Sequence, residues 1–264
     1  MSIFRGHQVI SNHGTKQGII PRFWLQTMEL AESVFGKAEG DKKLGDFFPK
    51  NVNDITNLYD LYQEIVTEYN DYKVGLSDER YFSINEKGQF KLDQSVELKL
   101  EKKIKDFFIL GRLLVNNFAK STIIDSEHFM LNKVIIVNDK NFEKNKLEYI
   151  ELDVSKRFLP LFDIIETARK EFLNEFNDVR AEIEHNNFSI PKFEINTKNG
   201  DFAEPSIHGN ASLIEELEHY YNNLLDLIET LIAYYFGIEA VSNNNNFALY
   251  IRKDYDFKKL FQNI

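Results

Sequence analysis

Residues 178–187 read DVRAEIEHNN, and the interpretation of the whole chain starts from this stretch. It contains Arg180 and His185, with four residues between them. Apolar residues recur before it at helical spacing, from about Ser155 onward: Phe158, Phe162, Ile165, Phe172, Phe176, Val179 and Ile183. A second segment with the same kind of pattern runs from Ala211 to Phe236. The sequence therefore predicts two long amphipathic helices, with the arginine and the histidine at the end of the first one.

The position of a helix end decides whether these two side chains can act together. Within a continuous helix, five positions at about 100° each place them roughly 140° apart around the axis. Both can reach one site only if the helix ends near Glu184. Asn186 and Asn187 are suited to end it, because asparagine tolerates the left-handed conformation that often follows a helix.

An arginine and a histidine separated by four to six residues, at the end of one bundle helix and ahead of the last helix, resemble the motif of HEPN domains. The resemblance covers Asp153 to Gly237 and, more loosely, the helical segments from Asn53 onward. Many HEPN proteins are metal-independent endoribonucleases that act as dimers. The resemblance implies that Arg180 and His185 are catalytic: the arginine would bind the scissile phosphate and the histidine would transfer a proton. It also implies a homodimer, RNA as a partner, and no cofactor or metal ion.

Two other interpretations remain open. Some HEPN domains have lost catalysis and serve as binding or regulatory modules, and Ala181 follows the arginine here where this family often has a polar residue. Alternatively, the chain is an unrelated helical protein with a structural role. In that case Arg180 pairs with Glu184 at i,i+4, and His185 is an ordinary residue at a helix C-terminus, where the dipole favours it.

Composition and charge limit the class of protein. The chain has 264 residues, of which 43% are hydrophobic, and its 23 Phe and 12 Tyr favour a folded core over disorder. It has no cysteine, which excludes disulfides, thiol nucleophiles and cysteine-bound zinc. No stretch has the length of a signal peptide core or a membrane span, so we expect a cytoplasmic protein that does not enter a membrane. A net charge of −10 argues against broad nucleic-acid binding but is compatible with a local basic site.

Local patterns predict the remaining elements. Helices are expected at Pro21–Phe35, Asp54–Tyr72 and Gln94–Ala119, and a short one at Asp125–Leu131; the third carries the densest set of basic residues: Lys99, Lys102, Lys103, Lys105 and Arg112. Gly36–Pro49 is expected to be a break. Hairpins are expected at Tyr81–Leu92 and from Lys133 to Leu152, and a strand near residue 193. His208 is expected in a surface loop.

The predicted fold is mainly α: a helical bundle with a HEPN-like C-terminal part and two or three peripheral β-hairpins. Residues 1–52 form an N-terminal arm and helix. Residues 53–264 form the HEPN-like bundle with hairpin insertions, and the two parts are expected to make one compact unit. No Gly-rich phosphate loop, nucleophile elbow, HExxH pair or carboxylate set with metal-ligand spacing occurs in the sequence.

Overall fold

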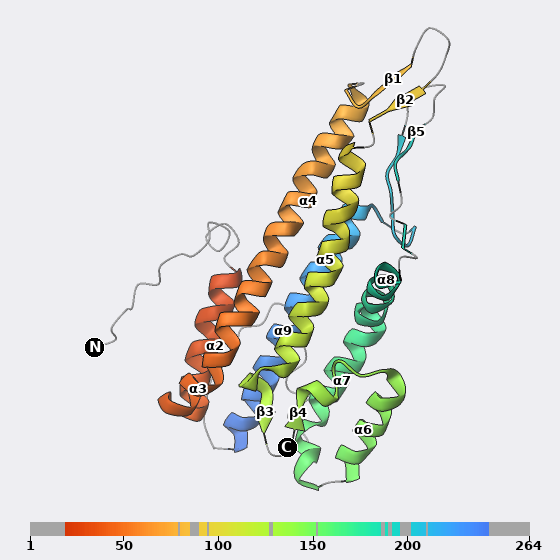
Figure 1. Cartoon of the computed structure of the whole chain (residues 1–264). Helices are drawn as coiled ribbons and strands as arrows, with labels where there is room; N and C mark the ends of the chain where they lie inside the picture. Colours follow the sequence, from red (N-terminus) through yellow and green to blue (C-terminus); the bar gives the residue numbers. More distant parts are fainter. Residues whose placement is uncertain are drawn as a thin grey trace, which may run out of the picture. The chain divides into compact units, whose positions relative to one another are not determined.

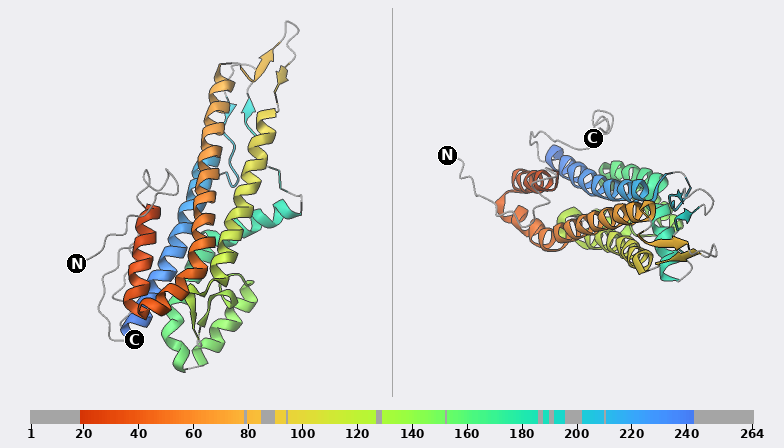
Figure 2. Two further views of the ribbon diagram at one scale, coloured as in Figure 1. Left: turned by 60° about the vertical axis from the view of Figure 1, so that its left-hand side comes forward. Right: turned by 90° about the horizontal axis from the view of Figure 1, so that it is seen from above.

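The protein is mainly helical (Figures 1 and 2). The structure is a computed structural model, and it describes residues 19–78, 80–84, 90–93, 95–126, 129–151, 153–185, 188–189, 192–195, 202–209 and 211–242. Within these ranges, no helix combines the length and the apolar character that crossing a membrane requires. The sequence pattern also predicts a strand at Phe247–Ile251 and a short helix at Phe257–Phe261, and both lie outside the described residues.

Most of the described chain is in long helices. They are α2 (Ile19–Phe35), α3 (Lys37–Phe47), α4 (Asn53–Ser77), α5 (Ser95–Lys120), α6 (Asp139–Glu151), α7 (Leu159–Ala168), α8 (Asn174–Glu184) and α9 (Leu213–Ser242). Short π-helical segments, Phe48–Val52 and Arg169–Leu173, join α3 to α4 and α7 to α8. Short strands pair antiparallel: β1 (Phe82–Ile84) with β2 (Phe90–Leu92), β3 (Asp125–Ser126) with β4 (Phe129–Met130), and β5 (Glu194–Ile195) with β6 (Phe202–Ala203).

The chain divides into two compact units, each assembled from separate stretches of sequence. The first, called unit 1, comprises residues 1–56, 115–166 and 226–264. The second, called unit 2, comprises residues 57–114 and 167–225, and it contains both Arg180 and His185.

Unit 1 is held together by aromatic packing around Phe162 of α7. Its ring lies 5.9 Å from that of Phe129 on β4, 5.9 Å from Phe142 on α6 and 5.0 Å from Tyr149 on α6. Figure 1 shows α6 and α7 beside the β3–β4 pair. Phe129, Phe142 and Phe162 are buried. These aromatic residues bring α6, α7 and the strand pair into one cluster.

Unit 2 packs α8 and the first half of α9 against α4 and α5. Phe108 of α5 lies 5.0 Å from Phe176 of α8 and 5.6 Å from Tyr220 of α9, measured between ring centroids. Tyr62 of α4 stacks on Tyr221 of α9 at 5.9 Å. Helices α5 and α8 also approach each other closely at Gly111, where an added Cβ atom would lie 2.5 Å from Phe176 Cζ. This glycine therefore allows α5 to approach α8 directly.

The long helices follow the predicted apolar patterns. The expected stripe on α4 is buried, with Ile55, Leu58, Tyr62, Ile65 and Tyr69 all at most 7% exposed. Helix α9 begins with a capping box: the Glu215 N–H donates to Ser212 Oγ, and the Ser212 N–H and hydroxyl both donate to Glu215 Oε2. The Ser-x-x-Glu pattern at residues 212–215 therefore marks the start of this helix.

The predicted break from Gly36 to Pro49 is wrong. Only Gly36 interrupts the helical chain, and its φ of 75° is a conformation that glycine adopts easily. From Lys37 onward the chain is helical again as α3. Leu44 and Phe47 are buried at a helical spacing, and this burial outweighs the destabilising effect of Gly40 and Gly45, which is about 1 kcal/mol for each glycine in a helix.

The predicted hairpin from Lys133 to Leu152 is also wrong, because α6 occupies most of that range. The polar residues read as its turn instead start the helix: the Asn141 N–H donates to Asn138 Oδ1 at 2.9 Å, as in an N-cap. The short helix expected at Asp125–Leu131 is replaced by the β3–β4 pair. In the range 81–92 the structure has the β1–β2 pair, and its connecting residues 85–89 lie outside the described part.

Candidate functional site

Helix α8 positions Arg180 and His185, and its buried face fixes its orientation. Phe176, Val179 and Ile183 are buried at spacings of three and four, so they form the side that packs on unit 2. The helix ends at Glu184, and His185 follows as its C-cap, with φ −82° and ψ 5°. The His185 N–H still donates to the Ala181 carbonyl oxygen at 3.0 Å.

The end of α8 agrees with the position that the sequence required. Arg180 lies one turn before the end and is 31% exposed, and His185 lies just beyond the end and is exposed. Asn186 and Asn187, the expected terminators, lie outside the described residues. Arg180 and His185 thus share one end of α8, although their side chains form no hydrogen bond with each other in the described structure. Their catalytic role stays a prediction.

The Arg180 guanidinium forms an ion pair with Glu184, one turn further along α8. Glu184 is 46% exposed, so solvent screens this pair and it contributes little to stability. The His185 side chain has no hydrogen bond or ion pair with any residue that the structure describes. The histidine is therefore accessible, whereas the arginine is held by an exposed carboxylate.

A second arginine lies beside this end of α8. Arg112, on α5, is half-buried, and its Nη1 donates to Asn177 Oδ1 on α8 at 3.0 Å. Burial lowers the pKa of Arg112, and the positive charges of Arg180 and Arg169 lower it further, while Glu184 opposes them. Arg112, Arg169 and Arg180 thus form a local concentration of positive charge in a protein whose net charge is −10. The sequence predicted that Arg112 lies on a basic helix, but it did not indicate that this residue lies near Arg180.

Two of the other basic residues of α5 form ion pairs with carboxylates. Lys103 Nζ lies 2.7 Å from Glu64 Oε2 and 2.8 Å from Glu68 Oε1, both on α4. Lys105 Nζ lies 2.6 Å from Glu101 Oε1. These pairs account for two of the lysines that made α5 a candidate surface for phosphate contacts.

His208 is better held than a surface-loop histidine would be. Its Nδ1 lies 3.2 Å from Glu175 Oε1 on α8, and its Nε2 is 2.9 Å from the hydroxyl of Tyr220 on α9. The backbone N–H groups of Ile207 and His208 donate to the Glu216 carboxylate, which fixes the loop. Both ring nitrogens therefore have partners, and the residue ties the loop to α8 and α9. No local sequence signal indicates this, because the partners of the ring lie on two different helices, α8 and α9.

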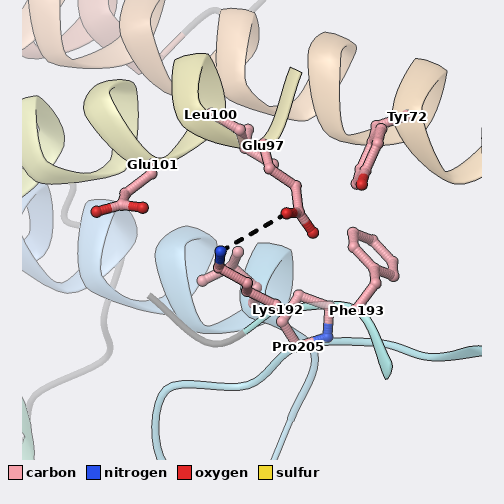
Figure 3. Close-up of a pocket in the computed structure, with 8 residues that line it drawn as sticks. Tyr72, Glu97, Leu100, Glu101, Lys192, Phe193 and Pro205 are labelled. Atoms are coloured by element: carbon pink, nitrogen blue, oxygen red, sulfur yellow. Dashed lines mark ion pairs between the residues drawn. The ribbon is translucent and has the colours of Figure 1, made fainter. Parts of the chain in front are cut away.

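Three of the hollows in unit 2 are lined by described residues, and neither Arg180 nor His185 lines any of these three. The most enclosed is a cavity of about 20 Å³ lined by Tyr72, Glu97, Leu100, Glu101, Lys192, Phe193, Pro205 and Leu213 (Figure 3). In it, Lys192 Nζ lies 3.8 Å from Glu97 Oε2. A hollow of about 330 Å³ lies beside His208, and one of about 440 Å³ lies between α4 and α5 near Asp60 and Asp106.

The enclosed cavity shows how the chain is fixed after the Arg–His segment. The Phe193 ring packs against Tyr69 at 5.1 Å and Tyr72 at 5.4 Å, both on α4. Together with the Lys192–Glu97 ion pair, these contacts hold residues 192–193 against α4 and α5. Residues 192–193 are therefore fixed in unit 2 by contacts with two helices.

Metal binding finds no support in the described residues, where no group of three or more histidine, aspartate or glutamate side chains could hold an ion. Comparison of the chain with family models, with curated proteins and with solved structures found no match. The candidate site therefore rests on its own geometry and chemistry.

Proposed function

We propose that this chain is a HEPN-like endoribonuclease that cleaves RNA without a metal ion and acts as a homodimer. The observation that carries the proposal is the end of α8, which leaves Arg180 and His185 at one helix terminus, both accessible to solvent. Arginine offers several hydrogen-bond donors in a geometry that suits phosphate. Histidine titrates near neutral pH and can both accept and donate a proton.

The proposed reaction needs no group other than these side chains and the RNA. The ribose 2′-oxygen attacks the adjacent phosphorus, and the bond from phosphorus to the 5′-oxygen of the next nucleotide breaks. A base takes the proton of the 2′-hydroxyl, and an acid gives a proton to the departing 5′-oxygen. The products are a 2′,3′-cyclic phosphate and a free 5′-hydroxyl. Arg180 would stabilise the negative charge that develops on the phosphoryl oxygens.

A dimer supports this chemistry because one motif supplies too few groups. Two proton transfers occur at opposite sides of the phosphorus, and each motif has a single histidine. A second copy would bring another His185 and another Arg180 to the same phosphate. This requirement and the family resemblance are the grounds for the homodimer in the proposal.

The test is cleavage of a mixed, end-labelled RNA pool by purified protein in EDTA. We expect the wild type to cleave, and Arg180→Ala and His185→Ala each to lose at least 100-fold in rate, the range in which a general acid–base group typically contributes. Arg80→Ala and His219→Ala are matched controls, because Arg80 is engaged with Asp71 and Asp78 and His219 is exposed on α9. Circular dichroism checks that every variant folds.

The outcomes separate the proposal from its alternatives. Cleavage that both substitutions abolish, with the two controls active and 2′,3′-cyclic phosphate ends on the products, supports the nuclease. Cleavage that is equally strong in Arg180→Ala and His185→Ala comes from a contaminant and contradicts it. Absence of cleavage in the wild type contradicts it as well.

A second candidate function is a HEPN-like module that binds RNA or a protein without cleaving it. The ion pair between Arg180 and Glu184 favours this candidate, because it occupies the arginine that the nuclease needs for phosphate. Glu184→Gln distinguishes the two. In a nuclease the variant should cleave RNA faster than the wild type, since it releases Arg180. In a module that binds RNA without cleaving it, the variant should bind RNA more tightly and still not cleave it, and in a module for a protein partner it should change neither quantity.

A further inference from the structure

Arg112 differs from most other basic residues of unit 2 in what it contacts. Asn177 is its only hydrogen-bond partner among the described residues, and this partner is an uncharged amide. Arg80 has carboxylates of Asp71 and Asp78 as partners, and Lys103 has those of Glu64 and Glu68. Arg112 is thus a half-buried cation with no carboxylate in hydrogen-bond or ion-pair contact in the described part of the chain.

The position of Arg112 is fixed by two features of the packing. Gly111, its neighbour on α5, allows the Phe176 ring of α8 to approach the α5 backbone, so the helices lie close at this point. The hydrogen bond to Asn177 then holds the guanidinium against α8. Asn177 and Arg180 are three residues apart on that helix and lie on the same side of it, at a Cβ separation of roughly 5–6 Å. Arg112 and Arg180 therefore present their guanidinium groups to one region of surface.

The positive charge of Arg180 disfavours the charged form of Arg112, Glu184 opposes this effect only in part, and burial of Arg112 adds to the cost. An anion between the two arginines offsets both effects, and a phosphate suits the geometry because each guanidinium can donate two hydrogen bonds to its oxygens. Asn177 uses one donor of Arg112 and leaves the others available. The purely structural role of Arg112, which is to join α5 to α8, needs only that one donor.

We propose that Arg112 is a second phosphate-binding residue, positioned by Asn177, and that with Arg180 it binds the backbone of single-stranded RNA. The inference rests on the proposed function, which it extends by a residue from a different helix. One arginine would contact the phosphate at the cleavage position and the other a neighbouring phosphate. Arg112 has no part in the proton transfers, so its effect is on binding.

The test measures the affinity for a short single-stranded RNA whose 2′-oxygens are methylated, which prevents cleavage. Fluorescence anisotropy gives the dissociation constant at several salt concentrations. Arg112→Gln is the main variant, because glutamine still offers a donor for Asn177 Oδ1 but carries no charge. Arg112→Lys keeps the charge and tests the guanidinium geometry. Arg80→Gln is the matched control, since it removes an exposed arginine from the same unit.

We expect Arg112→Gln to weaken binding about 10-fold and to reduce the slope of log affinity against log salt by about 0.7, the value for one phosphate contact on a single strand. Arg180→Gln should have a similar effect, and the double variant should lose about 1.4 from the slope. Arg112→Lys should keep the slope and lose part of the affinity. Arg80→Gln should match the wild type in both quantities.

The outcomes distinguish this inference from the proposed nuclease. If Arg112→Gln binds with the wild-type affinity and slope while Arg180→Gln is impaired, Arg112 is structural and the inference is wrong, but the nuclease is unaffected. If both variants are impaired and the wild type does not cleave unmodified RNA, the inference holds and the nuclease does not. A wild type with no measurable affinity for the methylated RNA overturns the inference. Cleavage of unmodified RNA then decides the nuclease separately.

Discussion

Tyr69 and Tyr72 on α4 are both buried, but their hydroxyl groups have different surroundings. The Tyr69 hydroxyl donates to Glu204 Oε2 at 2.8 Å, and Lys73 pairs with the same carboxylate. Burial and the bond to Glu204 raise the pKa of Tyr69, which keeps the hydroxyl a neutral donor. The Tyr72 hydroxyl lies beside the small cavity of Figure 3 and makes no direct hydrogen bond to a described residue. Burial and the nearby Glu97 raise its pKa as well.

Substituting each tyrosine with phenylalanine should therefore give different results. Tyr69→Phe removes a hydrogen bond to a carboxylate, and we expect the free energy of unfolding to fall by about 1–2 kcal/mol. Tyr72→Phe removes a hydroxyl that is buried without a direct bond, and we expect a change close to zero or a small gain. Urea unfolding followed by circular dichroism measures both. An equal or larger loss in Tyr72→Phe would contradict this and would point to a water molecule that bridges Tyr72 to Glu97.

The contact of α5 with α8 depends on the absence of a side chain at Gly111. An added Cβ would lie 2.5 Å from Phe176 Cζ and 3.1 Å from Leu224 Cδ1, and the Phe176 ring is fully buried. We expect Gly111→Ala to destabilise the protein by about 1–2 kcal/mol, because overpacking outweighs the gain of about 1 kcal/mol in helix propensity. Thermal unfolding monitored by circular dichroism measures the effect.

Gly45→Ala on α3 is the matched control for this prediction. A Cβ atom at Gly45 would meet nothing within 4 Å, so only the helix propensity changes and the variant should be more stable than the wild type. If Gly111→Ala were also stabilising, the two helices would be able to move apart at little cost. The position of Arg112 would then be less well defined than its hydrogen bond to Asn177 indicates.

The elements that the sequence predicted well are those whose apolar residues recur over many turns. Helix α4 follows this pattern, and its predicted stripe is buried. The sequence of helix α6 is more polar than that of α4. In residues 146–152, KLEYIEL, polar and apolar residues alternate as they do in a strand. In the structure Phe142 and Tyr149 lie seven residues apart, two turns of helix, and both contact Phe162. Phe162 is on another helix, α7, so the local sequence could not show whether the helical or the strand period applied to these residues.

The same distinction holds for the candidate site. The end of α8 near Glu184 could be predicted, because Asn186 and Asn187 follow a periodic segment that stops there. The connection of Arg112 with Arg180 could not, because it depends on a close helix approach at Gly111. The contacts of His208 with Glu175 and Tyr220 likewise join three elements. Side chains that meet only in the folded state leave no pattern along the chain.

At the scale of the whole molecule, the two units are continuous through helices. The chain passes between them after residues 56, 114, 166 and 225, and these points lie within α4, α5, α7 and α9. If one unit unfolded alone, each of these helices would have to end where it enters the other unit. Because helix formation is cooperative along the chain, we expect the two units to unfold together.

The only tryptophan, Trp24, lies in unit 1, where its ring is 5.0 Å from that of Phe48, and it offers a direct test of this coupling. Phe108→Ala removes a fully buried ring from unit 2 and should lower the free energy of unfolding by about 3–5 kcal/mol. If the units unfold together, Trp24 fluorescence and far-ultraviolet circular dichroism should give one transition in urea, shifted equally for both signals. Phe162→Ala, which removes the corresponding ring from unit 1, should shift both signals in the same way. A Trp24 transition that stays at the wild-type midpoint in Phe108→Ala, while the circular dichroism splits into two steps, would instead mean that unit 1 stays folded when the site-bearing unit 2 opens.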